Sequence, residues 1–150
     1  YITEDDVKEL EGEIFDAVRD AGGITGMHVC GNSDWGVVIR SGVDLVNFDA
    51  YQYGDTIGLY ADAVRALFER GGRLAWGIVP TSDAIREETA DSIVEKFNQC
   101  VSSLTQKGIP RDVVLERSLL TPSCGTGSMR EDDAARVFEV LREVRTAIVG

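Results

Sequence analysis

The 150-residue chain carries 15 basic and 26 acidic residues, which gives a formal net charge of −11 at pH 7. Such a balance leaves no basic patch to neutralise phosphates or anionic lipids, so we expect neither a nucleic-acid partner nor a membrane partner. No apolar run approaches the roughly 18 residues that a spanning helix needs, and the length suits one domain over residues 1–150. An odd cysteine count, three, suits thiols in a reducing compartment, so we expect a cytoplasmic protein.

Helical periodicity alternates with short apolar runs along the chain. The first predicted helix covers residues 4–21, with Thr3 as its N-cap and the Gly22-Gly23 pair at its end, and it carries one apolar stripe formed by Val7, Leu10, Ile14 and Val18. Strands are then predicted over residues 24–29, 43–49, 73–79 and 113–120. The helices that follow these strands are predicted over residues 34–41, 56–70, 83–107 and 131–149.

This order of elements predicts an α/β fold in which parallel strands alternate with helices through right-handed crossovers. Two arrangements satisfy the order, an open doubly wound sheet and part of a (βα)8 barrel. A complete barrel needs about 250 residues, so four βα units amount to half of one.

Chemically active residues follow each predicted strand. Parallel α/β proteins carry their functional residues at the carboxyl ends of the strands. The first strand ends in His28-Val29-Cys30, the second in Asp49, the third in Pro80-Thr81-Ser82-Asp83, and the fourth in the segment TPSCGTGS, which contains Cys124. We therefore expect one histidine, two cysteines and a carboxylate to gather on a single face.

These residue types are the ligands that zinc takes in a tetrahedral site. His28 and Cys30 stand two residues apart in a strand and so point the same way. Cys124 follows far too late in the chain for a zinc finger, and ligands from separate strand ends are typical of a catalytic site. Cys100, in mid-helix, is predicted to be a small buried hydrophobic residue.

The segments MHVCGN (27–32) and LTPSCGTGSM (120–129) together resemble the zinc site of cobalamin-independent methionine synthase and of related corrinoid-linked methyltransferases in the uroporphyrinogen decarboxylase superfamily. The resemblance covers nearly the whole chain, matched to the C-terminal half of a TIM (βα)8 barrel. It implies that His28, Cys30 and Cys124 bind Zn²⁺ and that Asp49 stands where methionine synthase has a glutamate ligand. It also implies transfer of a methyl group, as in methionine biosynthesis, to a homocysteine-like or coenzyme M-like thiol activated as a zinc thiolate.

The segment GIVPTSD (77–83) departs from that family. Methionine synthase has a histidine near this place that protonates the departing folate, whereas this chain has Ser82 and Asp83. We take Ser82 and Asp83, with Asp49, as candidate catalytic residues. The missing histidine favours a corrinoid or another methyl donor over folate.

A half barrel leaves two sheet edges open, and open edges invite pairing. Either a missing N-terminal half or a second copy in a homodimer is expected to close the barrel, and the chain alone can hold metal and still be inactive. Two other interpretations stay open: a zinc-binding or regulatory α/β module without catalysis, and a metal-free α/β domain in which His28 and the cysteines merely pack.

Overall fold

The computed structural model describes residues 3–149, apart from the side chains at positions 4 and 7. Four strands make one sheet: β1 (Gly26–Val29), β2 (Leu45–Phe48), β3 (Arg73–Val79) and β4 (Ser118–Pro122). The α-helices are α1 (Glu4–Asp20), α2 (Trp35–Arg40), α3 (Ala50–Tyr53), α4 (Ala61–Glu69), α5 (Ala90–Thr105), α6 (Arg111–Glu116) and α7 (Glu131–Val149). Two 3₁₀ segments, η1 (Gly54–Tyr60) and η2 (Asp83–Arg86), complete the regular structure.

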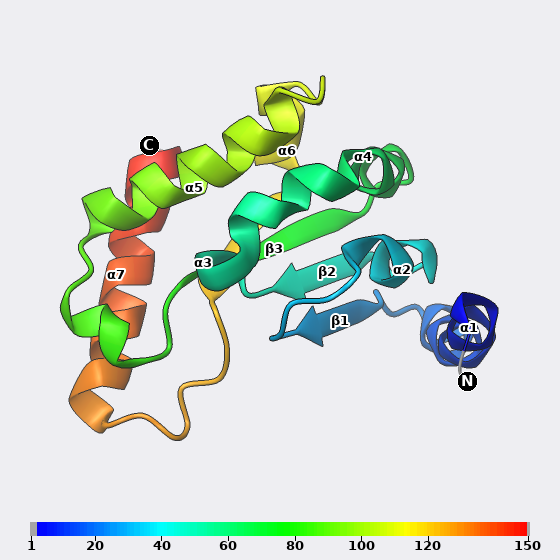
Figure 1. The fold of residues 1–150 in the computed structure, drawn as a ribbon. Coiled ribbons are helices and arrows are strands. Elements are labelled where there is room, and N and C mark those ends of the chain that lie inside the picture. Colours follow the sequence, from blue (N-terminus) through cyan, green and yellow to red (C-terminus); the bar gives the residue numbers. More distant parts are fainter. Residues whose placement is uncertain (1–2, 150) are drawn as a thin grey trace.

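The sheet is entirely parallel, with its strands in the order β1-β2-β3-β4. Helices α2, α4 and α5 lie over one face of it (Figure 1). Burial accordingly alternates along β2, where Val46 and Phe48 are buried, and on the opposite face His28 and Leu119 are exposed. The α/β prediction is confirmed, and a strand order that follows the chain is that of consecutive βα units rather than of a doubly wound sheet.

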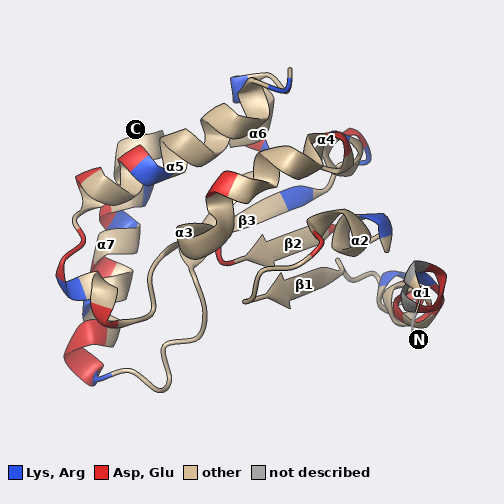
Figure 2. Ribbon diagram, viewed as in Figure 1, with Lys and Arg blue, Asp and Glu red and all other residues tan. Residues whose placement is uncertain are grey.

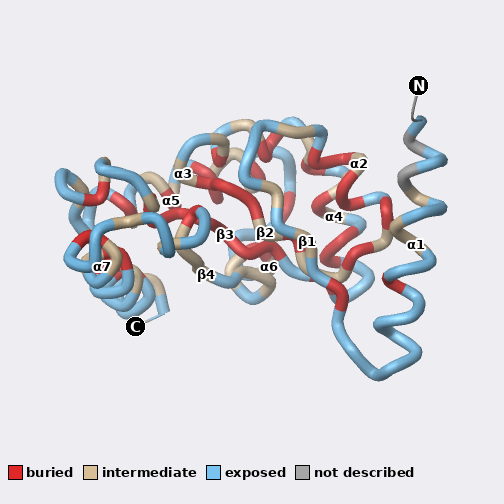
Figure 3. The backbone as a smooth tube through the Cα atoms, turned by 90° about the horizontal axis from the view of Figure 1, so that it is seen from below, coloured by how far each residue is buried: buried red, intermediate tan, exposed pale blue. Residues whose placement is uncertain are grey.

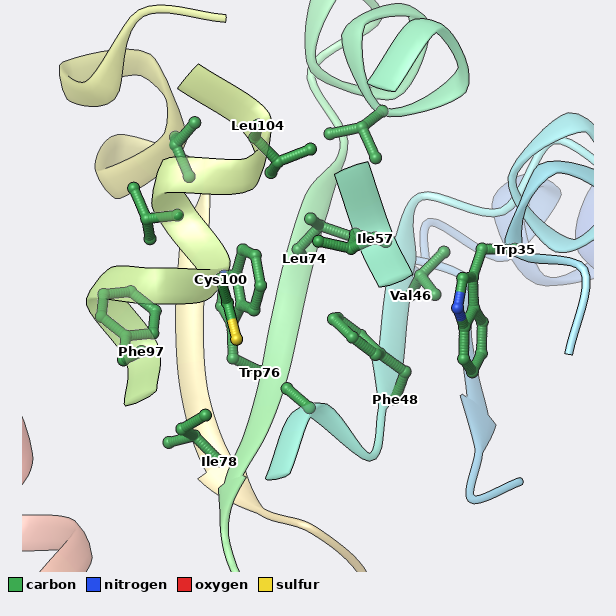
Figure 4. Packing of buried hydrophobic residues seen from close by; sticks show 14 of the residues in the cluster. Trp35, Val46, Phe48, Ile57, Leu74, Trp76, Ile78, Phe97, Cys100 and Leu104 are labelled. Atoms are coloured by element: carbon green, nitrogen blue, oxygen red, sulfur yellow. The ribbon is translucent and has the colours of Figure 1, made fainter. Parts of the chain in front are cut away.

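A row of four aromatic rings joins the sheet to its helices. Trp35 of α2, Phe48 of β2, Trp76 of β3 and Phe97 of α5 follow one another with ring centroids 5.2, 5.4 and 5.5 Å apart (Figure 4). Each of these residues is fully buried, and tilted or edge-on contacts at such distances are favourable beyond the area they bury. This row makes β2 and β3 the fixed centre from which the strand-end loops extend.

The fourth predicted strand, residues 113–120, is present, but only residues 118–120 of the predicted range belong to it. Residues Arg111–Glu116 form α6 instead, and β4 begins at Ser118. A short apolar run such as Val113-Val114-Leu115 fits a buried strand and a buried helix turn equally well. Pro110 decides between them, because its fixed φ of −59° suits the start of a helix.

Two long predicted helices are shorter than expected. The helix predicted over residues 56–70 is α-helical only from Ala61 onward, and 3₁₀ before it, where Gly58 packs so closely on α5 that a Cβ would lie 3.0 Å from the Ser103 backbone oxygen. The helix predicted over residues 83–107 begins at Ala90, because Thr89 caps it by accepting a hydrogen bond from the Ser92 amide.

Helix α1 lies at the edge of the molecule, beside β1 (Figures 1 and 3). Thr3 caps it as predicted, through a capping box with Asp6. The described members of its predicted apolar stripe do not face the core, however: Leu10 and Ile14 are 65% and 63% exposed, while Phe15 is buried, and the Val7 side chain lies outside the described residues. No strand of residues 3–149 lies against this stripe, so Leu10 and Ile14 remain at the surface of the part of the chain that the structure describes. None of the helices in residues 3–149 has the length and apolar character needed to cross a membrane.

An ion pair joins the segment after β3 to the start of α7. The Arg86 guanidinium donates two hydrogen bonds to the carboxylate of Asp133, at 3.0 and 2.6 Å. These bonds lower the pKa of Asp133 below its usual value. The pair therefore stabilises one end of the loop that carries Cys124.

Replacing Asp133 should make the thermal stability of the protein depend less on pH in the acidic range. Because the folded-state pKa of Asp133 is lowered, its contribution is complete above the unfolded-state pKa of about 4 and is lost as the pH falls through the lower folded-state value. Asp133→Asn should lower Tm by several degrees at neutral pH, and by progressively less below about pH 4. Asp132→Asn, on the same turn with a 93% exposed side chain, should change Tm little in thermal unfolding followed by circular dichroism. Equal effects of the two changes would contradict this.

Candidate metal centre

The imidazole of His28 and the thiols of Cys30 and Cys124 meet at the carboxyl end of the sheet. One ligand atom from each lies within 4.8 Å of the other two, and all three residues are exposed. His28 belongs to β1, Cys30 directly follows this strand, and Cys124 lies two residues beyond β4. The convergence expected from the strand-end positions is therefore present in the structure.

This meeting is not a simple result of strand order, because β1 and β4 are the two edges of the sheet. The loop between β4 and α7 must turn back across the strand ends (Figure 1). The buried residue Ser123 holds the turn: its amide donates to the carbonyl of Val79 at 2.8 Å, and its Oγ accepts a hydrogen bond from the Thr81 amide at 3.1 Å. Ser123 thus fixes the backbone directly before Cys124.

Gly77 provides the space for this turn. A Cβ at position 77 would lie 2.5 Å from the carbonyl oxygen of Phe48 and 2.8 Å from the Ser123 Cα atom, distances that real Cβ contacts do not reach. The pairing of β3 with β4 shifts register between Gly77 and Val79, and such an irregularity bends the strand locally. Glycine is required here for close approach of three backbone segments.

Asp49 lies beside the cluster but is not one of its three members. The carboxylate is buried and caps α3: Oδ1 accepts a hydrogen bond from the Gln52 amide at 2.9 Å, and Oδ2 accepts one from the Gln52 side-chain amide at 2.7 Å. Both oxygens therefore have donors within this turn. Asp49 as a zinc ligand stays a prediction.

The two other predicted catalytic residues lie in different environments. Ser82 lines a pocket of ≈ 450 Å³ together with Cys30, Cys124 and Asp49. Asp83 begins η2, its side chain is 86% exposed and pairs with Arg86 at 2.9 Å, and it does not line this pocket. The structure therefore brings Ser82 to the candidate site and leaves Asp83 outside it.

Tyr51 completes one wall of the same pocket. Its hydroxyl donates a hydrogen bond to the carboxylate of Glu88 at 2.7 Å, and this bond, together with burial, raises the pKa of Tyr51 to about 12. The phenol is protonated at neutral pH, as an unshifted tyrosine also is, and its proton is directed at Glu88. Tyr51 follows Asp49 by two residues, and this position at a strand end was the available signal for its role.

Asn47 is a further residue of the site that the sequence pattern did not single out. Its side-chain oxygen lies 2.5 Å from Nδ1 of His28, its neighbour across β1 and β2. An asparagine within the apolar run of a buried strand was the available signal, since its side chain needs hydrogen-bond partners there.

The surroundings of the thiols are nearly free of charge. The loop residues 121–129 contain no charged side chain (Figure 2), and among the described residues that line the pocket Asp49 is the only charged one.

Comparison of the sequence with known protein-family models gives no match, and no curated protein matches it.

The three cysteines should differ sharply in reactivity. Cys30 and Cys124 are exposed, whereas Cys100 is buried in the core beside Gly54 as predicted, and burial raises the pKa of its thiol to about 11. A thiol-reactive reagent should therefore modify two thiols in the folded, metal-free protein and a third only after unfolding. Cys30→Ser and Cys124→Ser should each remove one fast-reacting thiol, while Cys100→Ser should remove none. Fast reaction of Cys100 would contradict the placement of α5.

Proposed function

We propose that His28, Cys30 and Cys124 bind one Zn²⁺ ion and that the chain is a methyltransferase domain acting on a thiol. The observation that carries the proposal is the convergence of one imidazole and two thiols within 4.8 Å beside a pocket. The methyl-transfer chemistry is supported by the resemblance of MHVCGN and LTPSCGTGSM to the zinc site of methionine synthase and its corrinoid-linked relatives.

The donor set fits zinc on chemical grounds. Imidazole nitrogen and thiolate sulfur are the ligands that zinc prefers, and three protein ligands leave a fourth tetrahedral position for a substrate. A structural zinc site uses four protein ligands, and in the described chain only these three offer donor atoms close enough together. The exposure of all three is consistent with access for a small molecule.

When bound, the metal would supply Lewis acidity, which keeps a substrate thiol deprotonated at neutral pH. The residues of the chain do the remaining work. The pocket lined by Ser82, Tyr51 and Asp49 lies directly against the two cysteines and has room for a small thiol. Ser82 offers a hydroxyl group to a polar substrate there, and the Tyr51 oxygen, whose proton is donated to Glu88, can accept a hydrogen bond.

The charge of the pocket favours one class of acceptor. Asp49 provides a carboxylate, and within the described residues no lysine or arginine lines the pocket. A homocysteine-like amino acid carries an ammonium group that Asp49 attracts, provided that the amino acid's own carboxylate points away from Asp49. A coenzyme M-like thiol carries a sulfonate, which Asp49 would repel.

Closure of the barrel belongs to the same proposal. The outer edges of β1 and β4 pair with no further strand in residues 3–149, so either another half of a longer protein or a second copy would complete the barrel and contribute donor contacts. The absence of a histidine in residues 77–83 favours a corrinoid or another donor over folate. A thiol-dependent site of this kind suits the cytoplasm.

Metal analysis tests the ligand set. Protein purified without added metal and then titrated should bind about one zinc per chain. His28→Ala, Cys30→Ser and Cys124→Ser should each weaken binding by more than the roughly 10–100-fold that loss of an outer hydrogen-bonding partner costs. Cys100→Ser is the matched control and should bind as the wild type does, and Asp49→Asn should retain zinc because three ligands remain. Equal losses in all three cysteine variants would show that the assignment is wrong.

Spectroscopy of the cobalt-substituted protein tests the thiol acceptor. Addition of homocysteine should add one sulfur to the metal's ligands, seen as stronger sulfur-to-cobalt charge-transfer absorption, and coenzyme M should bind more weakly. Asp49→Asn should reduce the difference in binding affinity between homocysteine and coenzyme M, because it removes the charge that distinguishes the two thiols. A cobalt spectrum that does not change when either thiol is added would contradict the proposed thiol acceptor. The chain would then be a metal-binding module without methyl transfer.

A further inference from the structure

The side chain of Asn47 connects three strands on the sheet face opposite the helices. Its Nδ2 donates one hydrogen bond to the carbonyl of Ala75 and another to Oγ1 of Thr121, each at 2.9 Å. Its Oδ1 lies 2.5 Å from Nδ1 of His28. The side chain thus uses both of its N–H donors and presents its oxygen to the histidine.

The chemistry of these partners determines the orientation of the amide. A backbone carbonyl only accepts hydrogen bonds, so the atom of Asn47 that faces Ala75 has to be the NH₂ group. Rotating the amide by half a turn would place two oxygens against each other at that contact. Oδ1 therefore faces His28, and Oδ1 only accepts, so Nδ1 of His28 has to carry a proton.

We propose that Asn47 is a positioning residue that holds neutral His28 as the Nδ1–H tautomer and so reserves the Nε2 lone pair for the metal. The inference rests on the proposed zinc site, and it adds a tautomer and a ring orientation to it. Neutral imidazole in water favours the opposite, Nε2–H tautomer, whose proton would have to be displaced before zinc could bind at that atom. Histidine ligands are commonly held by such a bond from the other ring nitrogen.

The position of Asn47 in the sheet makes this hold rigid. Asn47 pairs in register with His28 on one side and with Ala75 on the other. Its two donated bonds reach β3 and β4, so the amide cannot rotate without breaking both. Thr121 lies in β4, three residues before Cys124. The same side chain therefore connects the strand that carries the histidine to the strand that leads to the second cysteine.

A purely structural role for Asn47 would also explain the bonds to Ala75 and Thr121. The two roles differ in what they predict for the imidazole. A structural amide that only joins strands would leave the tautomer of His28 as it is in water, whereas a positioning amide reverses it.

Nitrogen-15 NMR of the imidazole reads this tautomer directly, and His28 is the only histidine in the chain, so the spectrum has a single set of ring signals. In metal-free protein at about pH 8, above the usual histidine pKa, the wild type should show protonated Nδ1 and unprotonated Nε2. Asn47→Ala should revert to mainly Nε2–H, and its zinc affinity should fall by about 10–100-fold.

Thr121→Val is the matched control, because it removes a partner of Asn47 without contacting His28 and should leave the tautomer unchanged. An Nε2–H tautomer in the wild type, or an unchanged tautomer in folded Asn47→Ala, would overturn the proposal. The proposal would also be overturned if Asn47→Ala changed the tautomer of His28 to Nε2–H but bound zinc with the affinity of the wild type. Failure of the wild type to bind zinc would overturn the proposed function instead, and since the tautomer is read without metal, the two failures are distinguishable.

Discussion

The absence of a side chain at position 77 is the constraint on which the candidate centre depends. Gly77 allows the backbone of Ser123 and the carbonyl of Phe48 to approach β3 more closely than any Cβ would permit. This approach turns the chain after β4 back across the sheet instead of letting it continue outward. Without the turn, Cys124 would stay at one edge of the sheet and Cys30 at the other.

The remaining contacts at this end of the molecule build on that turn. Ser123 fastens it to Val79 at the end of β3 and to Thr81 beyond that strand, and the pair of Arg86 and Asp133 holds the far end of the loop against η2. The loop residues 121–129 carry no charge, and the contacts named here hold the loop at its two ends, by hydrogen bonds of Ser123 at one end and by the Arg86–Asp133 ion pair at the other. Neutral surroundings also leave the two thiols without a nearby cation, and a metal ion is the one proposed partner that would satisfy both.

The sequence predicted the parts of this arrangement that depend on local pattern. Alternating helical and apolar stretches indicated a parallel sheet, and the rule that parallel strands share a carboxyl end placed His28, Cys30 and Cys124 together. It could not separate a buried strand from a buried helix turn at Val113-Val114-Leu115, where both patterns look alike. The stripe on α1 was predicted as an ordinary amphipathic face. The pattern of a helix does not show whether a neighbouring element covers its apolar side. The role of Asn47 depends on strand register, which periodicity does not specify.

The two cysteines of the candidate centre are far apart in the chain, with β2, β3, β4 and the helices α2 to α6 between them. Any ion that joins Cys30 to Cys124 therefore closes a loop that contains most of the polypeptide. Closing a long loop removes more entropy from the unfolded chain than closing a short one. The binding energy of such an ion is in part folding energy. Zinc bound as proposed would then stabilise the folded protein as well as take part in its chemistry, and protein without the metal would unfold more readily.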